Sequence, residues 1–314
     1  MIIAEHRSSL NAHATRGLVR QPAYRAQRPW DGHRTDRSVV GTLYVVATPI
    51  GNLEDVTLRA LRVLAEVPLI AAEDTRTTRR LLERHGIATR LISYTDHNKP
   101  ARIPALLAHL ERADLALVSE AGTPAISDPG EDLVAAAAAA GHRVVAVPGP
   151  SAVMAALSVS GLPTRRFLYL GFLPRVGGER RALFHSVADL PYTLVAFESP
   201  YRLRAALVDA LAVLGDRAVA VCRELTKVHE EVYRGSLHGA LEHFQEPRGE
   251  FTLVIQGASA PRPTGNTLEA ALAEVTDLVA DGVSARDAVA TVARRRGLPR
   301  RQLYEAWLKG RPAE

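Results

Sequence analysis

The residues of this sequence that are best suited to bind a ligand lie in one twelve-residue stretch, 119–130, which reads SEAGTPAISDPG. Ser119, Thr123 and Ser127 provide hydroxyl groups that can donate or accept hydrogen bonds. Gly122 has no Cβ, so the main chain can approach a ligand closely there. A plain strand-to-helix connection needs only about 2–6 residues. The length and composition of the stretch therefore predict a ligand-binding loop.

Three similar loops occur in the same part of the chain. Short apolar runs that predict buried strands lie at 43–47, 69–72, 115–118 and 143–147. The polar loops that follow them lie at 48–55, 73–76, 119–128 and 148–151. Segments with helical periodicity separate the strands, at 57–67, 78–84 and 131–140. This alternation indicates a mainly parallel sheet, in which ligands bind outside the carboxyl ends of the strands, so these four loops are the candidate site.

A second set of apolar runs predicts another α/β unit. These runs lie near 167–170, 193–197, 218–222 and 251–256. The expected fold class is therefore α/β with two domains, followed by a small all-α module. The expected segments are a basic, disordered extension over 1–40, an N-terminal α/β domain over 41–163, a C-terminal α/β domain over 164–258, a linker over 259–266 and a helical module over 267–314.

The last part of the chain has the pattern of a helix-turn-helix. Ser284 is suited to start one helix, residues 297–299 form a turn, and a second helix is expected over 300–308. Apolar residues that share a helix face are Ala288, Val289 and Val292 in the first helix and Leu303, Tyr304 and Trp307 in the second. Arginines close to the turn are Arg294, Arg295, Arg296, Arg300 and Arg301. Their clustering favours nucleic-acid contact over a plain packing or dimerisation bundle, which stays open.

The positive charge of the chain is concentrated at its two ends. The net charge is +5, with +4 in residues 1–40 and +4 in residues 281–314, which leaves −3 for residues 41–280. Basic ends on a near-neutral body fit an enzyme with attached contacts to a polyanion. Aromatic residues make up only 5% of the chain, so a broad stacking surface for single-stranded RNA is not indicated.

Several common sites are missing from the sequence. It has no P-loop motif, no Gly-x-Gly-x-x-Gly fingerprint and no Gly-x-Ser-x-Gly elbow, and its histidines show no metal-ligand spacing, so we expect no metal. The one cysteine, Cys222, follows the apolar run 219–221, which indicates a small buried strand residue. No apolar stretch reaches the roughly 18 residues of a membrane helix, and residues 1–40 lack the core of a signal peptide, so we expect a cytoplasmic protein.

Seven short stretches, in order, carry a resemblance to a known family. They are GTLYVVATPIGNL at 41–53, AEDTR at 72–76, SYTDHNK at 93–99, SEAGTPAISDPG at 119–130, VPGPSAV at 147–153, FESPYR at 197–202 and RELTKVHEE at 223–231. The chain resembles the tetrapyrrole-methylase superfamily, and within it the small-subunit ribosomal RNA cytidine 2′-O-methyltransferases of the methyltransferase I family. The tail at 281–309 resembles the helical module at the C-terminus of that family, whereas residues 1–40 have no counterpart.

The resemblance implies that S-adenosylmethionine is bound in a cleft between the two α/β domains. The residues that it implies for cofactor binding are Pro49, Glu120, Ala121, Gly122, Thr123, Ile126, Ser127, Phe197 and Glu198. Most of them lie in the loop that the residue types themselves indicate as a ligand loop. The superfamily holds its cofactor with this loop, which accounts for the missing glycine-rich fingerprint.

The resemblance also implies a substrate: a cytidine in the decoding region of small-subunit (16S) ribosomal RNA, methylated on its ribose 2′-oxygen. A 2′-hydroxyl is a poor nucleophile, so the enzyme must align it with the methyl group and place a base or a cation beside it. Candidates near the cleft are Glu73, Asp74, Arg76, Glu224 and Lys227. We favour Lys227 or Glu73 as the catalytic residue near the 2′-oxygen, and an ion pair within the loop 73–76 is the alternative.

Candidate RNA-binding residues beside the cleft are Arg76, His97, Asn98, Lys99 and Arg202, for which a solvated loop is the alternative, and those in the tail are Arg294, Arg295, Arg300 and Arg301. The superfamily implies a homodimer. Two other functions stay open. One is methylation of a small tetrapyrrole of the corrin or uroporphyrin type, against which the basic tail argues. The other is a non-catalytic RNA-binding or assembly protein, against which the intact cofactor loops argue.

Overall fold

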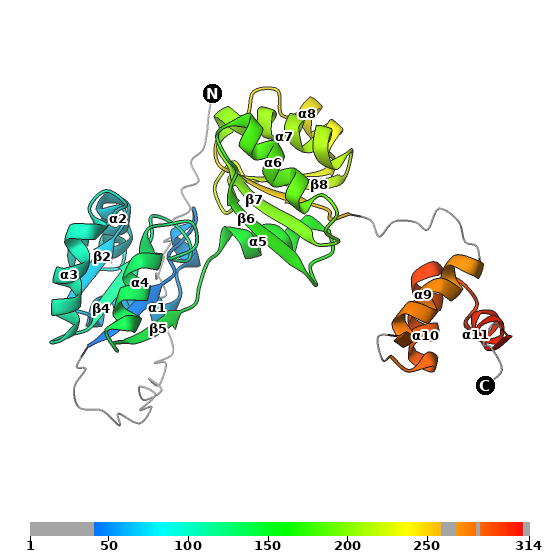
Figure 1. Cartoon of the computed structure of the whole chain (residues 1–314). Helices are drawn as coiled ribbons and strands as arrows, with labels where there is room; N and C mark the ends of the chain where they lie inside the picture. Colours follow the sequence, from blue (N-terminus) through cyan, green and yellow to red (C-terminus); the bar gives the residue numbers. More distant parts are fainter. Residues whose placement is uncertain (1–40, 259–267, 281–282, 310–314) are drawn as a thin grey trace, which may run out of the picture. The chain divides into compact units, whose positions relative to one another are not determined.

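The structure, a computed structural model, describes residues 41–258, 268–280 and 283–309 (Figure 1). The expected extension over 1–40 and the expected linker over 259–266 lie outside these residues. The described part contains two sheets of five strands each and a separate group of three helices, so the two-domain α/β fold class with C-terminal helices is confirmed. None of the described helices combines the length and the apolar composition that a membrane-spanning segment requires.

The first sheet is parallel throughout, with the strand order β3-β2-β4-β1-β5. Its strands are β1 (Thr42–Val46), β2 (Leu69–Ala72), β3 (Arg90–Ser93), β4 (Leu115–Val118) and β5 (Arg143–Val147). Four of them are the expected apolar runs, while β3, a partly exposed edge strand, was not expected. Because the strands are parallel, all four candidate loops leave the sheet at one edge.

Helices cover both faces of the first sheet. They are α1 (Leu58–Glu66), α2 (Thr75–Arg84), α3 (Lys99–Leu110) and α4 (Gly130–Ala139). Apolar residues of α1 and α2 pack against Val46, Ile70 and Val118 on one face, and those of α3 and α4 pack against Leu43 and Leu117 on the other. Helix α2 begins three residues earlier than expected, because the Asp74 carboxylate caps it by accepting hydrogen bonds from the Arg76 and Thr77 N–H groups.

The second sheet is mixed, with the order β6-β7-β10-β8-β9. Its strands are β6 (Phe167–Phe172), β7 (Thr193–Glu198), β8 (Ala218–Arg223), β9 (Glu231–Ser236) and β10 (Phe251–Ile255). Only β6 and β7 are parallel; the other pairs are antiparallel. Strand β9 at the edge was not expected. Cys222 is buried in β8, as expected.

Helix α5 (Ala152–Ser160) follows the first sheet in the chain but packs on the second. Val153 and Leu157 of α5 join one apolar cluster with Val195, Ala220 and Val254 of that sheet. The opposite face is covered by α6 (Gly177–Val187), α7 (Pro200–Leu214) and α8 (Leu237–His243). The second sheet is therefore a buried central layer, and the chain segment before α5 runs from the loop edge of the first sheet to the face of the second.

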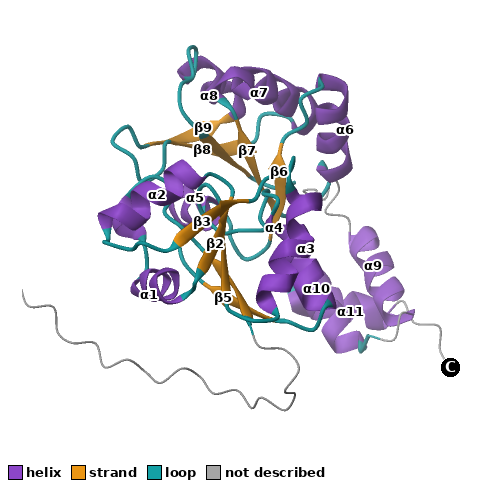
Figure 2. Cartoon of the chain, turned by 90° about the vertical axis from the view of Figure 1, so that its left-hand side faces the viewer, coloured by secondary structure: helices purple, strands orange, loops and turns teal. Residues whose placement is uncertain are grey.

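The three C-terminal helices form a bundle of their own (Figure 2). They are α9 (Leu268–Ala280), α10 (Ala285–Arg296) and α11 (Arg300–Lys309), and Ser284 caps α10 as expected. The expected apolar faces meet in its core, except that Tyr304 is partly exposed. Glu274 of α9 binds Arg295 and Arg296 at 2.7 Å each, so these two arginines stabilise the bundle.

Candidate functional site

Hydrogen bonds join the candidate loops at the edge of the first sheet. Thr48 and Gly122 form a two-way antiparallel bridge, with N–H to O distances of 2.9 and 3.1 Å. The Thr123 hydroxyl donates to the Pro150 carbonyl at 3.1 Å. The Glu120 N–H donates to a Glu73 carboxylate oxygen at 3.1 Å. The four loops are therefore one connected structure, with 119–128 at its centre.

The loop 119–128 is shaped from within by Asp128. One oxygen of its carboxylate accepts hydrogen bonds from the N–H groups of Ala125, at 2.8 Å, and Gly130, at 2.7 Å. Gly122 has a φ of +85° and Ser127 a φ of +64°. A positive φ is costly for a residue with a side chain, so contacts around the loop must impose this conformation. Residues with such strained backbone cluster at ligand sites.

A pocket of about 800 Å³ opens beside this loop. A volume of this size suits an organic cofactor. All eleven residues predicted for cofactor binding or catalysis line it, namely Pro49, Glu73, Glu120, Ala121, Gly122, Thr123, Ile126, Ser127, Phe197, Glu198 and Lys227. Residues from both sheets contribute to its wall. The predicted site residues, which are spread over nearly 180 positions of the chain, thus meet in one place.

The pocket carries more negative than positive side chains. The acidic residues in its lining are Glu73, Glu120, Asp128, Glu198 and Glu250, and the basic ones are Arg80 and Lys227. Two buried carboxylate oxygens, Oε2 of Glu198 and Oδ2 of Asp128, accept no hydrogen bond from any described residue. A buried acceptor without a donor is costly, so these oxygens are free to bind a ligand that carries donors or positive charge.

Glu198 is held in place by its second oxygen. Its Oε1 accepts a hydrogen bond from the Ser199 N–H at 2.7 Å and pairs with Arg202 at 2.7 Å. Burial raises the pKa of Glu198, and these donors oppose the rise. The arrangement fixes the orientation of the carboxylate and leaves Oε2 without a hydrogen-bond donor among the described residues.

Burial also raises the pKa of Glu73, and the carboxylates of Asp128 and Glu120 add to the rise, whereas the hydrogen bond from the Glu120 N–H opposes it. A carboxylate with a raised pKa is a stronger base than an ordinary one. Of the two predicted catalytic residues, Glu73 therefore has the properties of a proton acceptor.

Lys227 has the opposite character. Its ammonium group pairs with Glu224 at 2.9 Å and with Glu250 at 2.8 Å. Partial burial acts to lower the pKa of Lys227, but the hydrogen bonds to Glu250 and Glu224 outweigh it, and the net pKa is raised. Lys227 is thus a fixed cation at neutral pH, suited to stabilise negative charge rather than to accept a proton.

The backbone that carries Lys227 is strained. Glu224 and Thr226 have φ values of +50° and +67°. The Asn52 N–H donates to the Thr226 hydroxyl at 3.1 Å, which ties this turn to the loop after β1. Ala125 and Ser127 are the other non-glycine residues with positive φ among those described, so all four occur in segments next to the pocket.

The predicted RNA-binding residues of the α/β part differ in their exposure and in the groups that they bind. Arg76 is exposed and pairs with Asp74 at 3.0 Å, and His97 is exposed. Asn98 binds Ser93 and Thr95 of its own loop. Lys99 pairs with Asp96 and Asp132. Arg202 pairs with the buried Glu198, so the guanidinium of Arg202 is directed to the protein interior.

Residues that the sequence reasoning did not assign complete the pocket. Asp128 and Glu250 add carboxylates, Arg80 adds a cation and Phe172 adds an aromatic ring. Asp128 could have been found, because it lies within the predicted ligand loop just before a helix. Phe172 and Glu250 lie at or next to the ends of two predicted strands whose apolar pattern indicates no site, and only the fold brings them to the pocket.

Comparison with known proteins identifies similar sequences over most of the chain. The family model for Tetrapyrrole (Corrin/Porphyrin) Methylases matches residues 42–240. A protein of Halalkalibacterium halodurans named ribosomal RNA small subunit methyltransferase I is 45% identical over 273 residues, which are 85% of this chain and 94% of the relative. A protein of Synechocystis sp. with the same name is 47% identical over 274 residues, 86% of this chain and 98% of the relative.

A solved structure shows the same fold at low identity. The uroporphyrin III C-methyltransferase of Thermus thermophilus has a TM-score of 0.51 and 21% identity, and the match covers 69% of this chain and 97% of that one. Such an enzyme of this organism is also solved in complex with S-adenyl homocysteine. At this identity the likeness concerns the fold alone.

Proposed function

The chain belongs to the ribosomal RNA small subunit methyltransferase I family within the tetrapyrrole methylases, and from that premise we propose that it methylates small-subunit ribosomal RNA with S-adenosylmethionine as the methyl donor. We propose further that the acceptor is the ribose 2′-oxygen of a cytidine in the decoding region. The observation that carries the proposal is the convergence of all predicted cofactor-binding and catalytic residues on one pocket.

The residues of the pocket fit S-adenosylmethionine. This cofactor has a sulfonium and an ammonium cation, and the pocket has an excess of carboxylates. The free oxygens of Glu198 and Asp128 can accept hydrogen bonds from ammonium or hydroxyl groups. Gly122 lines the pocket without a side chain, so the main chain can approach a ligand closely there. Phe197 and Ile126 offer apolar surface for the base.

When bound, the cofactor supplies an electrophilic methyl group with a good leaving group. The protein then has to position a ribose hydroxyl and manage its proton. Glu73, with its raised pKa, accepts the proton of the 2′-hydroxyl. Lys227, a cation held by Glu224 and Glu250, stabilises the negative charge that develops on the 2′-oxygen. The two residues predicted as alternatives therefore have complementary roles.

RNA contacts away from the pocket are assigned to the C-terminal helical module, which we place at 267–314. Arg294, Arg300 and Arg301 are exposed there, and the first two form no ion pair with a described residue. Exposed arginines beside a helix turn suit contacts to phosphates. We also propose a cytoplasmic enzyme and a homodimer.

The proposal is tested by mapping the modification. Small ribosomal subunits that lack it are incubated with the purified enzyme and S-adenosylmethionine, and the RNA is digested and sequenced by mass spectrometry. The expected result is one added methyl on the ribose of a decoding-region cytidine. A methyl on a base, or on another nucleotide, would contradict the assignment of the acceptor as the 2′-oxygen of that cytidine. It would still support methylation of small-subunit RNA. The description of the matching family model, Tetrapyrrole (Corrin/Porphyrin) Methylases, keeps a tetrapyrrole acceptor as the second candidate.

A further inference from the structure

The turn that follows β6 presents side chains to solvent at the rim of the pocket. Phe172 lines the pocket and is 57% exposed, and its ring lies 5.4 Å from that of Phe197 in an edge-to-face contact. Val176, four residues on, is 58% exposed. Tyr201, at the start of α7, is 96% exposed. Phe172 lines the pocket and Tyr201 follows Pro200, which also lines it. Large exposed apolar side chains beside a pocket indicate a contact surface.

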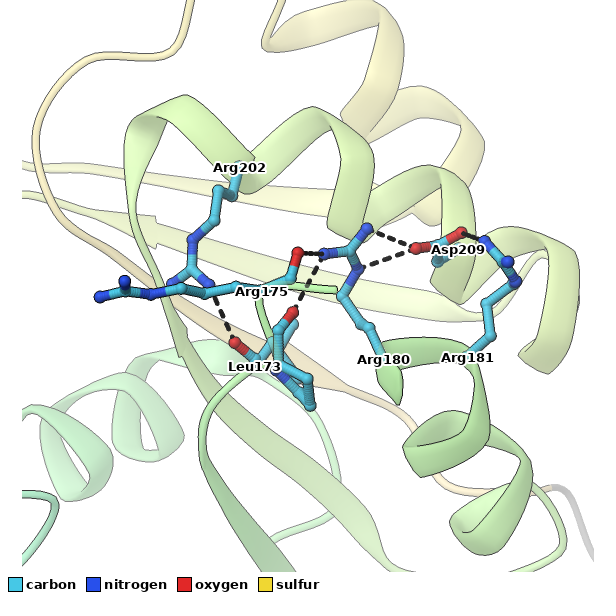
Figure 3. Close-up of polar contacts among 7 residues, drawn as sticks. Leu173, Arg175, Arg180, Arg181, Arg202 and Asp209 are labelled. Atoms are coloured by element: carbon cyan, nitrogen blue, oxygen red, sulfur yellow. Dashed lines mark hydrogen bonds and ion pairs between the residues drawn. The ribbon is translucent and has the colours of Figure 1, made fainter. Parts of the chain in front are cut away.

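This turn is held rigidly from beneath (Figure 3). Arg180 is buried and pairs with Asp209 at 2.5 Å, and its guanidinium also donates to the Pro174 carbonyl at 3.1 Å. The guanidinium of Arg202 donates to the Leu173 carbonyl at 3.1 Å. Two arginines thus fix two consecutive carbonyls of the turn, which limits its motion when a ligand binds.

The side chain of Arg175, in the same turn, does not join the contacts that Arg180 and Arg202 make beneath it. The Arg175 carbonyl faces Arg180, whereas its side chain extends away from Asp209 in Figure 3. The residue is exposed, and no described carboxylate lies within ion-pair distance of its guanidinium. Tyr201 follows Pro200, which lines the pocket, and precedes Arg202, which binds Leu173, so it lies at the same rim. The rim therefore combines two aromatic rings with one unpaired cation.

We propose that Phe172, Arg175 and Tyr201 form the contact site for the single-stranded RNA segment on either side of the methylated nucleotide. Single-stranded RNA is recognised by bases that stack on aromatic rings and by arginines that bind phosphates. A rim of this composition next to the methyl-transfer pocket would hold the flanking nucleotides and leave the target ribose free to enter. The inference rests on the proposed function, since it requires RNA as the acceptor.

The test compares Tyr201→Ala and Arg175→Ala with the wild type and with Arg112→Ala. Arg112 is an exposed arginine that precedes β4, at the opposite edge of the first sheet from the pocket. The measured quantities are KM for unmodified small subunits, kcat, and the Kd of S-adenosylhomocysteine by calorimetry. We expect each rim variant to raise KM about tenfold, with kcat and the cofactor Kd changed less than twofold. Tyr201→Phe should retain the wild-type KM, because it keeps the ring.

Salt dependence separates the two kinds of contact. Arg175→Ala should lower the slope of log Kd for subunits against log salt by about one, whereas Tyr201→Ala should leave it unchanged. An unchanged KM in both rim variants of an enzyme that methylates RNA would overturn the rim assignment alone. If the wild type transfers no methyl to RNA, the proposed function fails and the rim assignment fails with it.

Discussion

Gly51 lies directly beneath the side chain of Lys227: a Cβ at position 51 would come within 2.4 Å of the Lys227 Cγ and within 2.8 Å of the Thr226 hydroxyl. The loop after β1 can thus lie against the strained turn that carries Lys227 only because residue 51 is glycine. Since the same turn is tied to Asn52 by a hydrogen bond, the position of the Lys227 cation depends on this contact.

Gly51→Ala should therefore displace Lys227 and lower kcat about tenfold, because the cation no longer lies where negative charge develops. The Kd of S-adenosylhomocysteine should change less than twofold. The control is Gly178→Ala in α6, where a Cβ meets no atom within 4 Å. Equal kcat values for Gly51→Ala and the wild type, in steady-state methyl transfer, would show that Lys227 is not positioned by this contact.

Gly122→Ala should weaken cofactor binding. The φ of +85° makes any side chain costly by about 1–2 kcal/mol, and the new methyl group comes within 3.4 Å of Ile50, a residue that lines the pocket. We expect a roughly tenfold higher Kd for S-adenosylhomocysteine by calorimetry. Gly86→Ala has the same backbone cost at a φ of +67°, with nothing near its Cβ, and should keep the wild-type Kd. A similar rise in both variants would mean that strain alone, rather than the pocket, accounts for the effect.

The acid limb of the rate profile should report on Glu73. The carboxylate is the form that accepts a proton, and burial raises its pKa above the ordinary value of 4.5. As pH falls, activity should therefore be lost at a higher pH than for an exposed glutamate. Glu73→Gln should lower kcat about 100-fold and remove this limb. Glu66→Gln, an exposed glutamate at the end of α1, is the control. An unchanged acid limb in Glu73→Gln would exclude Glu73 as the base.

The buried pair of Arg180 and Asp209 should matter for stability. Arg180→Met leaves Asp209 as a buried charge without its main partner, so the free energy of unfolding in urea should fall by about 3–5 kcal/mol. Replacing both, as Arg180→Met with Asp209→Leu, should recover most of the loss. A double variant as unstable as the single one would show that the contacts of Arg180 to the turn carbonyls dominate.

The pair also predicts a pH dependence of stability. Burial acts to raise the pKa of Asp209, but the hydrogen bonds from Arg181 and Arg180 outweigh it and lower the pKa below the ordinary 3.8. The stabilisation is therefore present above pH 3.8 and is lost as pH falls through the lower folded value. The stability difference between the wild type and Asp209→Asn should shrink over that window.

The helical module offers a test of RNA binding. Replacing Arg294 and Arg300 together by glutamine should lower the slope of log Kd against log salt by about two for small subunits, if each contacts one phosphate. Arg296→Gln, which removes a partner of Glu274, should destabilise the bundle and leave the slope of log Kd against log salt unchanged. An unchanged salt slope in the double variant would assign the module a packing role.

Much of the fold could be predicted because its central strands are uninterrupted apolar runs. Strands β2, β4 and β5 begin and end where the sequence pattern places them. Strands β3 and β9 were not predicted, since edge strands are partly exposed and their sequences alternate weakly. The orientation of β10 between β7 and β8 could not be predicted either, because periodicity carries no strand direction.

The site was predictable where a loop follows a strand and not where distant segments meet. Residues 119–128 stand out by composition, whereas Glu250 reaches Lys227 only through the pairing of β10 with β8. The left-handed backbone at Glu224 and Thr226 has no sequence signal, because such residues usually avoid positive φ. The pair of Arg180 and Asp209, 29 residues apart, likewise depends on how α6 packs on α7.

The most direct measurement is the transfer of labelled methyl from S-adenosylmethionine to a panel of acceptors: unmodified small subunits, naked small-subunit RNA and uroporphyrinogen. We predict that the wild type labels ribosomal RNA, that Gly122→Ala at limiting cofactor labels it more slowly, and that uroporphyrinogen gains no label. Label on uroporphyrinogen alone, or cofactor binding with no transfer to any RNA acceptor, would contradict the account.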